Sequence, residues 1–586
     1  ALKREAAVDT RSHKSGKGVA DLITRWDDEA ASVGWDAHGL VDVLNTGRVD
    51  HTEPTPTISV EQLVDVLSSS GSTWNRAQIV SALTDIARPD PTLTGTQWAE
   101  RIENWADAVI AHCTELDPID ASTPRRRSDG RSLRHEPVSP HITTEAILAE
   151  EEHIASWALV AQADESRPST TVDVRHLDVL QADVARAVAG LDQLVLVVGP
   201  AGTGKTTTLR AAIDDLEGHE RSVFGVAPSA KGARVLERET GIATDTLDKL
   251  LHEHLRGDRP PLERYRLTTG TTVIVDEAGM VGTHSLAKLN RLAESNGWRV
   301  ALVGDPYQLQ AVGRGGMFHE LTLTGRVHKL DRIHRFTEPW EAVASLKLRR
   351  GDRRALDDYI AHGRVIPGTL DEQLATITEQ WRSSHAAGES LAITASSNDH
   401  VDRINHVIQR ARANAGDIDT SSLAPIAGDE FACVGDVIVT RRNDRRLVTT
   451  TDELVRNRET WTVTHIADDR TITALSNEGT GTVMLPAGYA ATHVHLGYAA
   501  TEHGNQGDTT TTAIELVSGH TSRRGLYVGA TRGRSRNLML VVTESHDLDE
   551  ARDTLERVLA NDRVDLPAIA QRRELAEAVR PATPRH

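Results

Sequence analysis

The amino-acid sequence predicts an α/β fold in which two parallel-sheet domains follow a helical N-terminal region. Short aliphatic runs alternate with helical stretches in two blocks, at residues 194–303 and 391–542, as buried parallel strands and their covering helices do. Within the second block, residues 426–495 are rich in Val and Thr and have few helix signals. Residues 51–170 carry apolar side chains at three- and four-residue spacing, which indicates helices.

These changes in pattern predict where the domains begin and end. We expect a helical remnant or linker at 1–50, a helical domain at 51–170, a first α/β domain at 171–335, a second at 336–425 and 496–550, a β-rich insert of SH3 or OB type at 426–495, and a C-terminal helix and tail at 551–586. Within the second domain, the run Leu526–Val528 is expected to be a strand. After a helix at about 547–560, the polar remainder is expected to be a loose tail.

The composition excludes several classes of protein. The chain has 586 residues, of which 39% are hydrophobic and 26% charged, which is typical of a folded globular protein. Its net charge of −19 argues against coating nucleic acid by bulk charge, although a local basic channel remains compatible with it. Aromatic residues are only 3%, so platforms for stacking bases are few.

The same composition suggests a cytoplasmic location. No apolar stretch reaches the length of a membrane helix, so no membrane segment is expected, and the N-terminus lacks a secretion signal. The two cysteines, Cys113 and Cys433, cannot form a disulfide framework. Because the sequence does not begin with Met, we expect a fragment or a processed product.

The strongest motif is a phosphate-binding loop. The aliphatic run at 194–198 leads into GPAGTGKT and then a helical stretch, which is GxxxxGK[ST] in the strand–loop–helix context it requires. The glycines let backbone N–H groups point at phosphate oxygens, and the following helix N-terminus favours negative charge. Lys205 is expected to reach the β- and γ-phosphates, and the Thr206 hydroxyl to bind Mg²⁺. The alternative is an ordinary glycine-rich turn.

Two further strands end in residues that suit this chemistry. The run TVIV ends in Asp276 and Glu277; Asp276 can supply a carboxylate to Mg²⁺, and Glu277 can accept a proton from an attacking water. The run VALV leads to Gln308 in GDPYQL, at the edge of the sheet where ligands bind. Gln308 could sense the γ-phosphate; alternatively, Gly-Asp-Pro builds a surface turn.

The motifs and their order along the chain resemble those of a helicase family. GPAGTGKTT, VIVDEAGM, VGDPYQL, a later Thr-x-His-x-x-Gln-Gly-x-Thr and YVGATRGR are similar to the motifs of RecD-like superfamily 1B DNA helicases. They resemble most closely the helicase part of MobF-type (TrwC/TraI-like) conjugative relaxases. The resemblance implies two RecA-like domains that hold ATP and Mg²⁺ between them.

The resemblance also implies roles for individual residues. Arg335 in LDRIHRF and Arg532 in YVGATRGR match arginines that reach the γ-phosphate, where a guanidinium stabilises the charge that builds up during phosphoryl transfer. As isolated residues, both would be read as surface salt bridges. The implied catalytic set is Lys205, Glu277, Gln308, Arg335 and Arg532. The implied nucleotide contacts are Gln181 at the adenine, Gly199, Pro200, Ala201, Gly202, Thr203, Gly204, Lys205, Thr206, Thr207 and Gly507.

Contacts to single-stranded DNA are expected at Lys231, in the motif APSAKG, and at Thr501 and His503. The alternative for Thr501 and His503 is packing within their loop. Trp461 could stack on a base, but a core position is favoured. The arginines of RRNDRR at 441–446 suit DNA contact and solvent exposure equally. The arginine-rich stretch at 125–134 is expected to be a solvated loop, with a DNA-contacting loop as the alternative.

We therefore expect an ATP-dependent single-stranded DNA translocase and helicase, moving 5′→3′, that acts on single strands and on junctions with duplex, in conjugative plasmid processing beside conjugation or recombination proteins. A RecD-like repair helicase is the alternative within the same class. A nucleotide-gated DNA-binding scaffold is the alternative of another class. The first tyrosine is Tyr265 and no histidine triad precedes it, so we expect no relaxase nicking activity in this chain.

Overall fold

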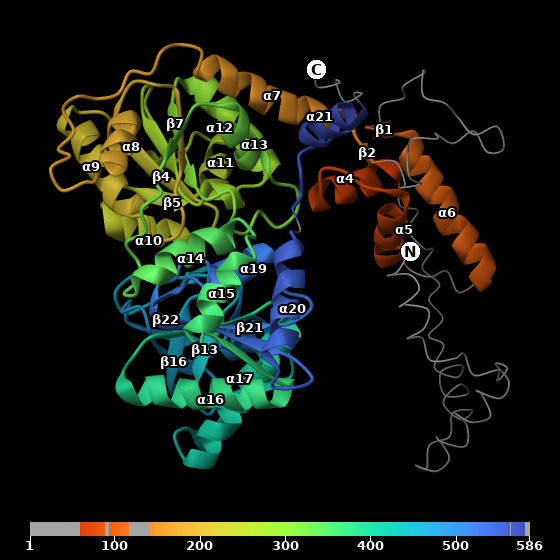
Figure 1. Ribbon diagram of the computed structural model, residues 1–586, viewed down its shortest axis with the longest axis vertical. Coiled ribbons are helices and arrows are strands. Elements are labelled where there is room, and N and C mark those ends of the chain that lie inside the picture. The colour runs from red at the N-terminus through yellow and green to blue at the C-terminus, as the bar shows by residue number, and fades with distance from the viewer. Residues whose placement is uncertain (1–58, 88–92, 117–140, 563, 580–586) are drawn as a thin grey trace. The chain divides into compact units, whose positions relative to one another are not determined.

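The computed structural model describes residues 59–87, 93–116, 141–562 and 564–579 (Figure 1). The predictions for residues 1–50 and for the arginine-rich stretch at 125–134 lie outside these ranges. The chain divides into two compact units, and the larger, Val60–Ile86 with Ala99–His586, holds both of the larger parallel sheets described below. Among the described residues, no helix combines the length and the apolar character needed to cross a bilayer.

The region before the first sheet is helical, as the apolar spacing predicts. Its helices are α4 (Val60–Ser70), α5 (Arg76–Ile86), α6 (Gly95–Ala111) and α7 (Glu145–Ala161). The N-terminus of α7 is capped by the Thr144 hydroxyl, which accepts from the Ile147 backbone N–H. Ile154 and Trp157 of α7 are buried in the core of the first sheet, so this helix forms part of the first lobe.

The first lobe is a six-stranded parallel sheet with helices on both faces. The strand order is β5-β4-β6-β7-β3-β8, with β3 (Leu194–Val198), β4 (Val223–Ala227), β5 (Thr244–Thr246), β6 (Thr272–Val275), β7 (Arg299–Gly304) and β8 (Val327–Lys329). The predicted aliphatic runs are these strands, and the side chains of β3, β6 and β7 are buried throughout. This burial on both faces explains why the runs are continuously apolar and do not alternate.

The helices of this lobe divide between the two faces of the sheet (Figure 1). One face packs against α8 (Val179–Ala189) and α9 (Lys205–Gly218). The other packs against α7, α11 (Leu247–Leu255), α12 (Thr283–Asn296) and α13 (Met317–Thr324). Helix α10 (Ala230–Thr240) follows β4. All six strands are parallel, so the loops that follow β3, β6 and β7 meet at one edge.

The second lobe has the same architecture. Its sheet has the order β20-β10-β21-β22-β9 and is parallel, with β9 (Val365–Gly368), β10 (Leu391–Ala395), β20 (Ala500–Thr501), β21 (Thr510–Val517) and β22 (Gly533–Val542). Helices α14 (Pro339–Arg349), α15 (Arg354–Ala361), α19 (Arg523–Gly529) and α20 (Leu548–Ala560) pack on one face. Helices α16 (Leu370–Ala387) and α17 (Asn398–Ala415) pack on the other. The predicted α/β fold class is thus confirmed.

One predicted strand of this lobe is wrong. Residues Leu526–Val528 lie inside helix α19 and are fully buried. After its two arginines this short helix is buried all round, so Leu526–Val528 form an uninterrupted apolar run like that of a buried strand.

The Val- and Thr-rich region forms an antiparallel sheet, as its composition predicts. The strand order is β18-β17-β16-β13-β19, with β13 (Val437–Thr440), β16 (Thr460–Ile466), β17 (Ile472–Ser476), β18 (Thr482–Leu485) and β19 (Val494–Leu496). Two hairpins, β11 (Asp419–Ile426) with β12 (Glu430–Val434) and β14 (Asp444–Val448) with β15 (Leu454–Val455), and helix α18 (Ala487–His493) complete the region. Trp461 is buried in its core, as favoured, and Arg446 of RRNDRR is exposed and pairs with Asp444.

The segment that follows α20 is not a loose tail as far as residue 579, and the prediction for residues 580–586 lies outside the described residues. Residues Ala568–Val579 form helix α21. Just before it, the Asp565 carboxylate accepts hydrogen bonds from the backbone N–H groups of Ser72 and Gly315, each at 3.0 Å. At its start, the Ile569 N–H donates to Glu151 of α7 at 3.0 Å. The prediction fails because polar contacts, which leave no apolar pattern in the sequence, anchor this segment.

Candidate nucleotide-binding site

The phosphate-binding loop joins the central strand β3 to helix α9. The backbone of Gly202 has φ of +81°, and a Cβ built there would lie 2.4 Å from the Cβ of Arg335, so only glycine fits this turn. The Lys205 ammonium donates to the Gly199 carbonyl at 3.0 Å. Gln181, in a capping box with Asp178 at the start of α8, donates to the Thr203 carbonyl at 3.2 Å. Gln181 therefore supports the loop directly.

Two carboxylates follow strand β6 at the same edge of the sheet. Asp276 accepts from the Glu277 backbone N–H at 2.9 Å. Glu277 has φ of +51°, an uncommon conformation for a residue with a side chain. Burial, and then the neighbouring Glu277 carboxylate, raise the pKa of Asp276 to about 6, while the Lys205 charge opposes them. The site therefore favours a further cation at Asp276.

Strand β7 leads to a loop that carries Gln308. Asp305 in this loop forms a two-pronged ion pair with Arg349 of α14, with N–O distances of 2.6 to 3.1 Å. The Tyr527 hydroxyl of α19 donates to Asp305 at 3.2 Å and accepts from the Ala201 backbone N–H at 3.3 Å. Groups from the second lobe thus fix this loop against the phosphate-binding loop. None of these three side chains was expected from the sequence.

The two candidate arginines lie close together beside the phosphate-binding loop. Arg335 donates to the Thr531 carbonyl at 2.6 Å. Arg532 is buried and donates to the carbonyls of Val528 at 2.8 Å and Asp508 at 3.3 Å. Burial, and then the charge of Arg532, lower the pKa of Arg335 to about 9, and burial also lowers the pKa of Arg532. Because burial and a neighbouring cation disfavour the charged form of Arg335, an anion bound beside it would be stabilised.

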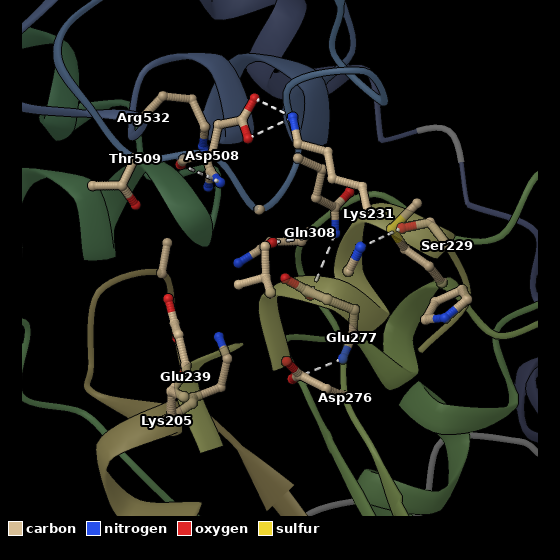
Figure 2. Close-up of a pocket in the computed structure, with 18 of the residues that line it drawn as sticks. Lys205, Ser229, Lys231, Glu239, Asp276, Glu277, Gln308, Asp508, Thr509 and Arg532 are labelled. Atoms are coloured by element: carbon tan, nitrogen blue, oxygen red, sulfur yellow. Dashed lines mark hydrogen bonds and ion pairs between the residues drawn. The ribbon is translucent and has the colours of Figure 1, made fainter. Parts of the chain in front are cut away.

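The loop of the second lobe between β20 and β21 supplies two side chains that the sequence analysis missed. The Gln506 amide donates to Glu277 at 3.5 Å and to Gln308 at 3.3 Å. The carboxylate of Asp508 lies 2.7 Å from the Lys231 ammonium (Figure 2). Both residues belong to the Gln-Gly motif, so their positions could have been inferred from it. Lys231, expected at a DNA phosphate, has an acidic partner here.

These residues surround one cavity of about 950 Å³ (Figure 2), which is in the range of pockets that hold small-molecule ligands. Most of the predicted site residues line it: Ala201, Gly202, Thr203, Gly204, Lys205, Thr206, Thr207, Lys231, Asp276, Glu277, Gln308, Arg335, His503, Gly507 and Arg532. Those that lie outside its lining are Gln181, Gly199, Pro200 and Thr501.

Two of the expected DNA contacts differ in their surroundings. Thr501 belongs to β20, and its carbonyl accepts from the Gly504 and Asn505 N–H groups at 2.7 and 3.1 Å. His503 lines the cavity, and burial lowers the pKa of its imidazole. Thr501 therefore organises the loop through its backbone, and His503 faces the cavity.

Part of the chain is similar in sequence to known proteins. The AAA domain family matches residues 176–369. The probable conjugal transfer protein TraA of Sinorhizobium fredii is 31% identical over 350 residues, which are 59% of this chain and 31% of TraA. The ATP-dependent RecD2 DNA helicase of Deinococcus radiodurans is 34% identical over 163 residues, 26% of this chain and 21% of RecD2. The chain is thus similar to conjugal transfer proteins and to a RecD-like DNA helicase. The resemblance inferred from the motifs is thus confirmed.

The chain is also similar to a solved structure. The Pif1 helicase from Bacteroides, crystallised with ADP-AlF3 and single-stranded DNA, is 18% identical, with a TM-score of 0.44, over 69% of this chain and 98% of that one. The chain spans less than a third of the length of the TraA and RecD2 relatives it matches.

Proposed function

We propose that this chain is an ATP-dependent translocase on single-stranded DNA and a DNA helicase. The observation that carries the proposal is the shared cavity: Lys205, Asp276 and Glu277 of the first lobe face Gln506 and Arg532 of the second. A phosphate-binding loop on one lobe and arginines against the other suit hydrolysis of a triphosphate held between them.

The residues present fit a nucleotide with Mg²⁺. Carboxylate and hydroxyl oxygens are the ligands that Mg²⁺ prefers, and Asp276 and Thr206 both line the cavity. The raised pKa of Asp276 means that its charged form lacks compensation from the protein alone. When bound, Mg²⁺ would neutralise charge on the β- and γ-phosphates.

The side chains of the site then take distinct roles. Glu277 accepts a proton from the attacking water. Gln308 and Gln506, which are hydrogen-bonded to each other, hold that water and sense the γ-phosphate. Arg335 and Arg532 stabilise the charge that develops in the transition state.

Movement on DNA would follow from the division of these groups between two lobes. Gln506 and Arg532 reach the first lobe only while the lobes are close together, so binding of nucleotide favours closure and release of product favours opening. If each lobe holds the DNA backbone, alternate closing and opening moves the strand through the protein. Lys231, Thr501 and His503 are the proposed DNA contacts, and the resemblance favours 5′→3′ movement.

We propose a role in conjugative plasmid DNA processing in the cytoplasm. The longest match among the relatives reported is to a conjugal transfer protein, which favours this role over DNA repair. Single strands, junctions with duplex, and conjugation or recombination proteins are the proposed partners.

The proposal is tested by ATP hydrolysis and strand displacement. ATPase activity should rise strongly when a single-stranded oligonucleotide is added. Duplexes with only a 5′ tail should be unwound, and duplexes with only a 3′ tail should not. Unwinding from the 3′ tail alone would reverse the polarity, and nucleotide binding without unwinding of either duplex would favour the scaffold alternative.

A further inference from the structure

Arg524 is a buried arginine of the second lobe that reaches across to the loop carrying Gln308. Only 4% of its side chain is exposed. Its Nη1 donates to the Pro306 carbonyl at 2.6 Å and to the Gln308 carbonyl at 2.9 Å. A guanidinium that binds two main-chain carbonyls so close in sequence fixes the conformation of the loop between them.

The opposite edge of the Arg524 guanidinium is also held. Its Nε donates to the Asp562 carboxylate at 2.9 Å. Asp562 lies beyond α20 and also pairs with Arg523, whose side chain is more exposed, at 20%. Arg523 makes no contact with the Gln308 loop among the hydrogen bonds of the described residues. The two adjacent arginines therefore share an acidic partner but differ in what else they hold.

Through helix α19, Arg524 links the loop of Gln308 to Arg532. Helix α19 carries Arg524 in its first turn and ends just before Arg532, which lines the cavity. The same helix therefore holds the backbone of Gln308 at one end and leads to a candidate catalytic arginine at the other. Gln308 is itself in contact with Gln506 at 3.3 Å. A shift of α19 would move Gln308 and Arg532 together.

We propose that Arg524 is a positioning residue for Gln308, oriented by Asp562, and that it acts on turnover through the placement of that side chain. This inference rests on the proposed ATPase function. Arg524 lies outside the lining of the cavity, so it acts through the loop of Gln308, whose position it fixes when the two lobes are closed.

The test compares steady-state ATPase kinetics of the full chain with and without a single-stranded oligonucleotide. Arg524→Gln leaves two buried carbonyls without their donor, and kcat should fall by about tenfold or more with KM for ATP within about twofold. Arg524→Lys keeps the positive charge but cannot hold both carbonyls in the same geometry, so its kcat should lie between those of Arg524→Gln and the parent. Asp562→Asn should lower kcat in the same direction, and the matched control Arg523→Gln should stay within about twofold of the parent.

A double-mutant cycle with Gln308→Ala separates positioning from general destabilisation. If Arg524 acts through Gln308, adding Arg524→Gln to Gln308→Ala should cause little further loss. The inference would be overturned if the fold-losses in kcat of the two single variants multiplied in the double variant, or if Arg524→Gln left kcat unchanged. If Arg524→Gln does not fold, Arg524→Lys and Asp562→Asn enter the same cycle. Absence of ATPase activity in the parent chain would refute the proposed function itself, which is a different outcome.

Discussion

The Lys231 ammonium lies 2.7 and 2.9 Å from the two carboxylate oxygens of Asp508, joining helix α10 of the first lobe to the Gln-Gly loop of the second. Both side chains are largely buried, with 20% and 28% exposed. An ion pair of this kind holds two lobes together, and its carboxylate competes with any phosphate that approaches the lysine.

Removing that carboxylate should make the lysine available to a nucleic-acid backbone. Asp508→Asn is expected to strengthen binding of a single-stranded oligonucleotide by about three- to tenfold at low salt, and to steepen its dependence on salt concentration. Fluorescence anisotropy over a series of salt concentrations measures both. Asp358→Asn, which breaks the Lys347–Asp358 pair away from the cavity, is the control. An unchanged salt dependence would mean that Lys231 serves lobe closure alone.

Lys205 and Glu277 should affect different steps of the reaction. Lys205→Ala is expected to abolish turnover and weaken nucleotide binding, because the ammonium interacts with the phosphates in both the ground state and the transition state. Glu277→Gln should keep nucleotide affinity and lose turnover, because the amide cannot accept the proton of the attacking water. Binding of a fluorescent ATP analogue and phosphate release distinguish the two effects. Full turnover in Glu277→Gln would exclude this residue as the base.

Arg532 should contribute mainly to the transition state. Arg532→Ala is expected to lower kcat by about 10²- to 10³-fold with a smaller change in KM, because the charge it stabilises develops during phosphoryl transfer. Arg536→Ala, in the same strand region but exposed and outside the cavity lining, should keep parental kinetics. Equal losses in nucleotide affinity and turnover would indicate ground-state binding.

Local patterns predicted much of this molecule because its first lobe places strand, loop and helix consecutively. Lys205 follows its strand within one short loop, and Asp276 directly follows another, so sequence alone brings them to one edge of the sheet. Burial makes these strands continuously apolar, and it has the same effect in helix α19, in which Leu526, Tyr527 and Val528 are almost fully buried. This apolar run therefore led to the wrong prediction of a strand.

Contacts between distant segments were not predictable in the same way. Lys231 and Asp508 are 277 positions apart, and either charge is unremarkable by itself. The pairing of Arg524 with the Gln308 carbonyl joins a side chain to a main-chain group, for which no residue type is diagnostic. The family resemblance located Arg335 and Arg532, but it did not indicate which groups hold them.

Two buried glutamates should make stability depend on pH. Glu502 and Glu515 lie against glycines of α19, and a Cβ on Gly529 would be 1.7 Å from a Glu515 oxygen. Burial raises the pKa of Glu502 to about 7, and burial together with Glu502 raises the pKa of Glu515 well above its usual value. Both favour the protonated form in the folded state. The contribution of Glu502 to stability is complete below about pH 4.5 and is lost as the pH rises through about 7, and that of Glu515 is lost as the pH rises through its own raised pKa.

The measurement is the melting temperature between pH 5 and 9. The parent should lose stability across neutral pH, by about 1–3 kcal/mol from Glu502, whereas Glu502→Gln, which is neutral at every pH, should show a smaller decline. Glu389→Gln, at an exposed position, is the control. The same decline in Glu502→Gln and the parent would place the titration elsewhere.

Asp565 should anchor the C-terminal segment both to the loop between α4 and α5 and to the first lobe. Its carboxylate accepts from the backbone N–H and hydroxyl of Ser72 and from the Gly315 N–H, each at 3.0 Å. Asp565→Ala leaves these donors without a partner, which should cost about 2–4 kcal/mol locally. Amide exchange in peptides that cover Ser72 and Gly315 should therefore accelerate by about 30-fold or more, while the exposed control Asp553→Ala leaves it unchanged. Unchanged exchange in Asp565→Ala would show that helix α21 holds this region without the carboxylate.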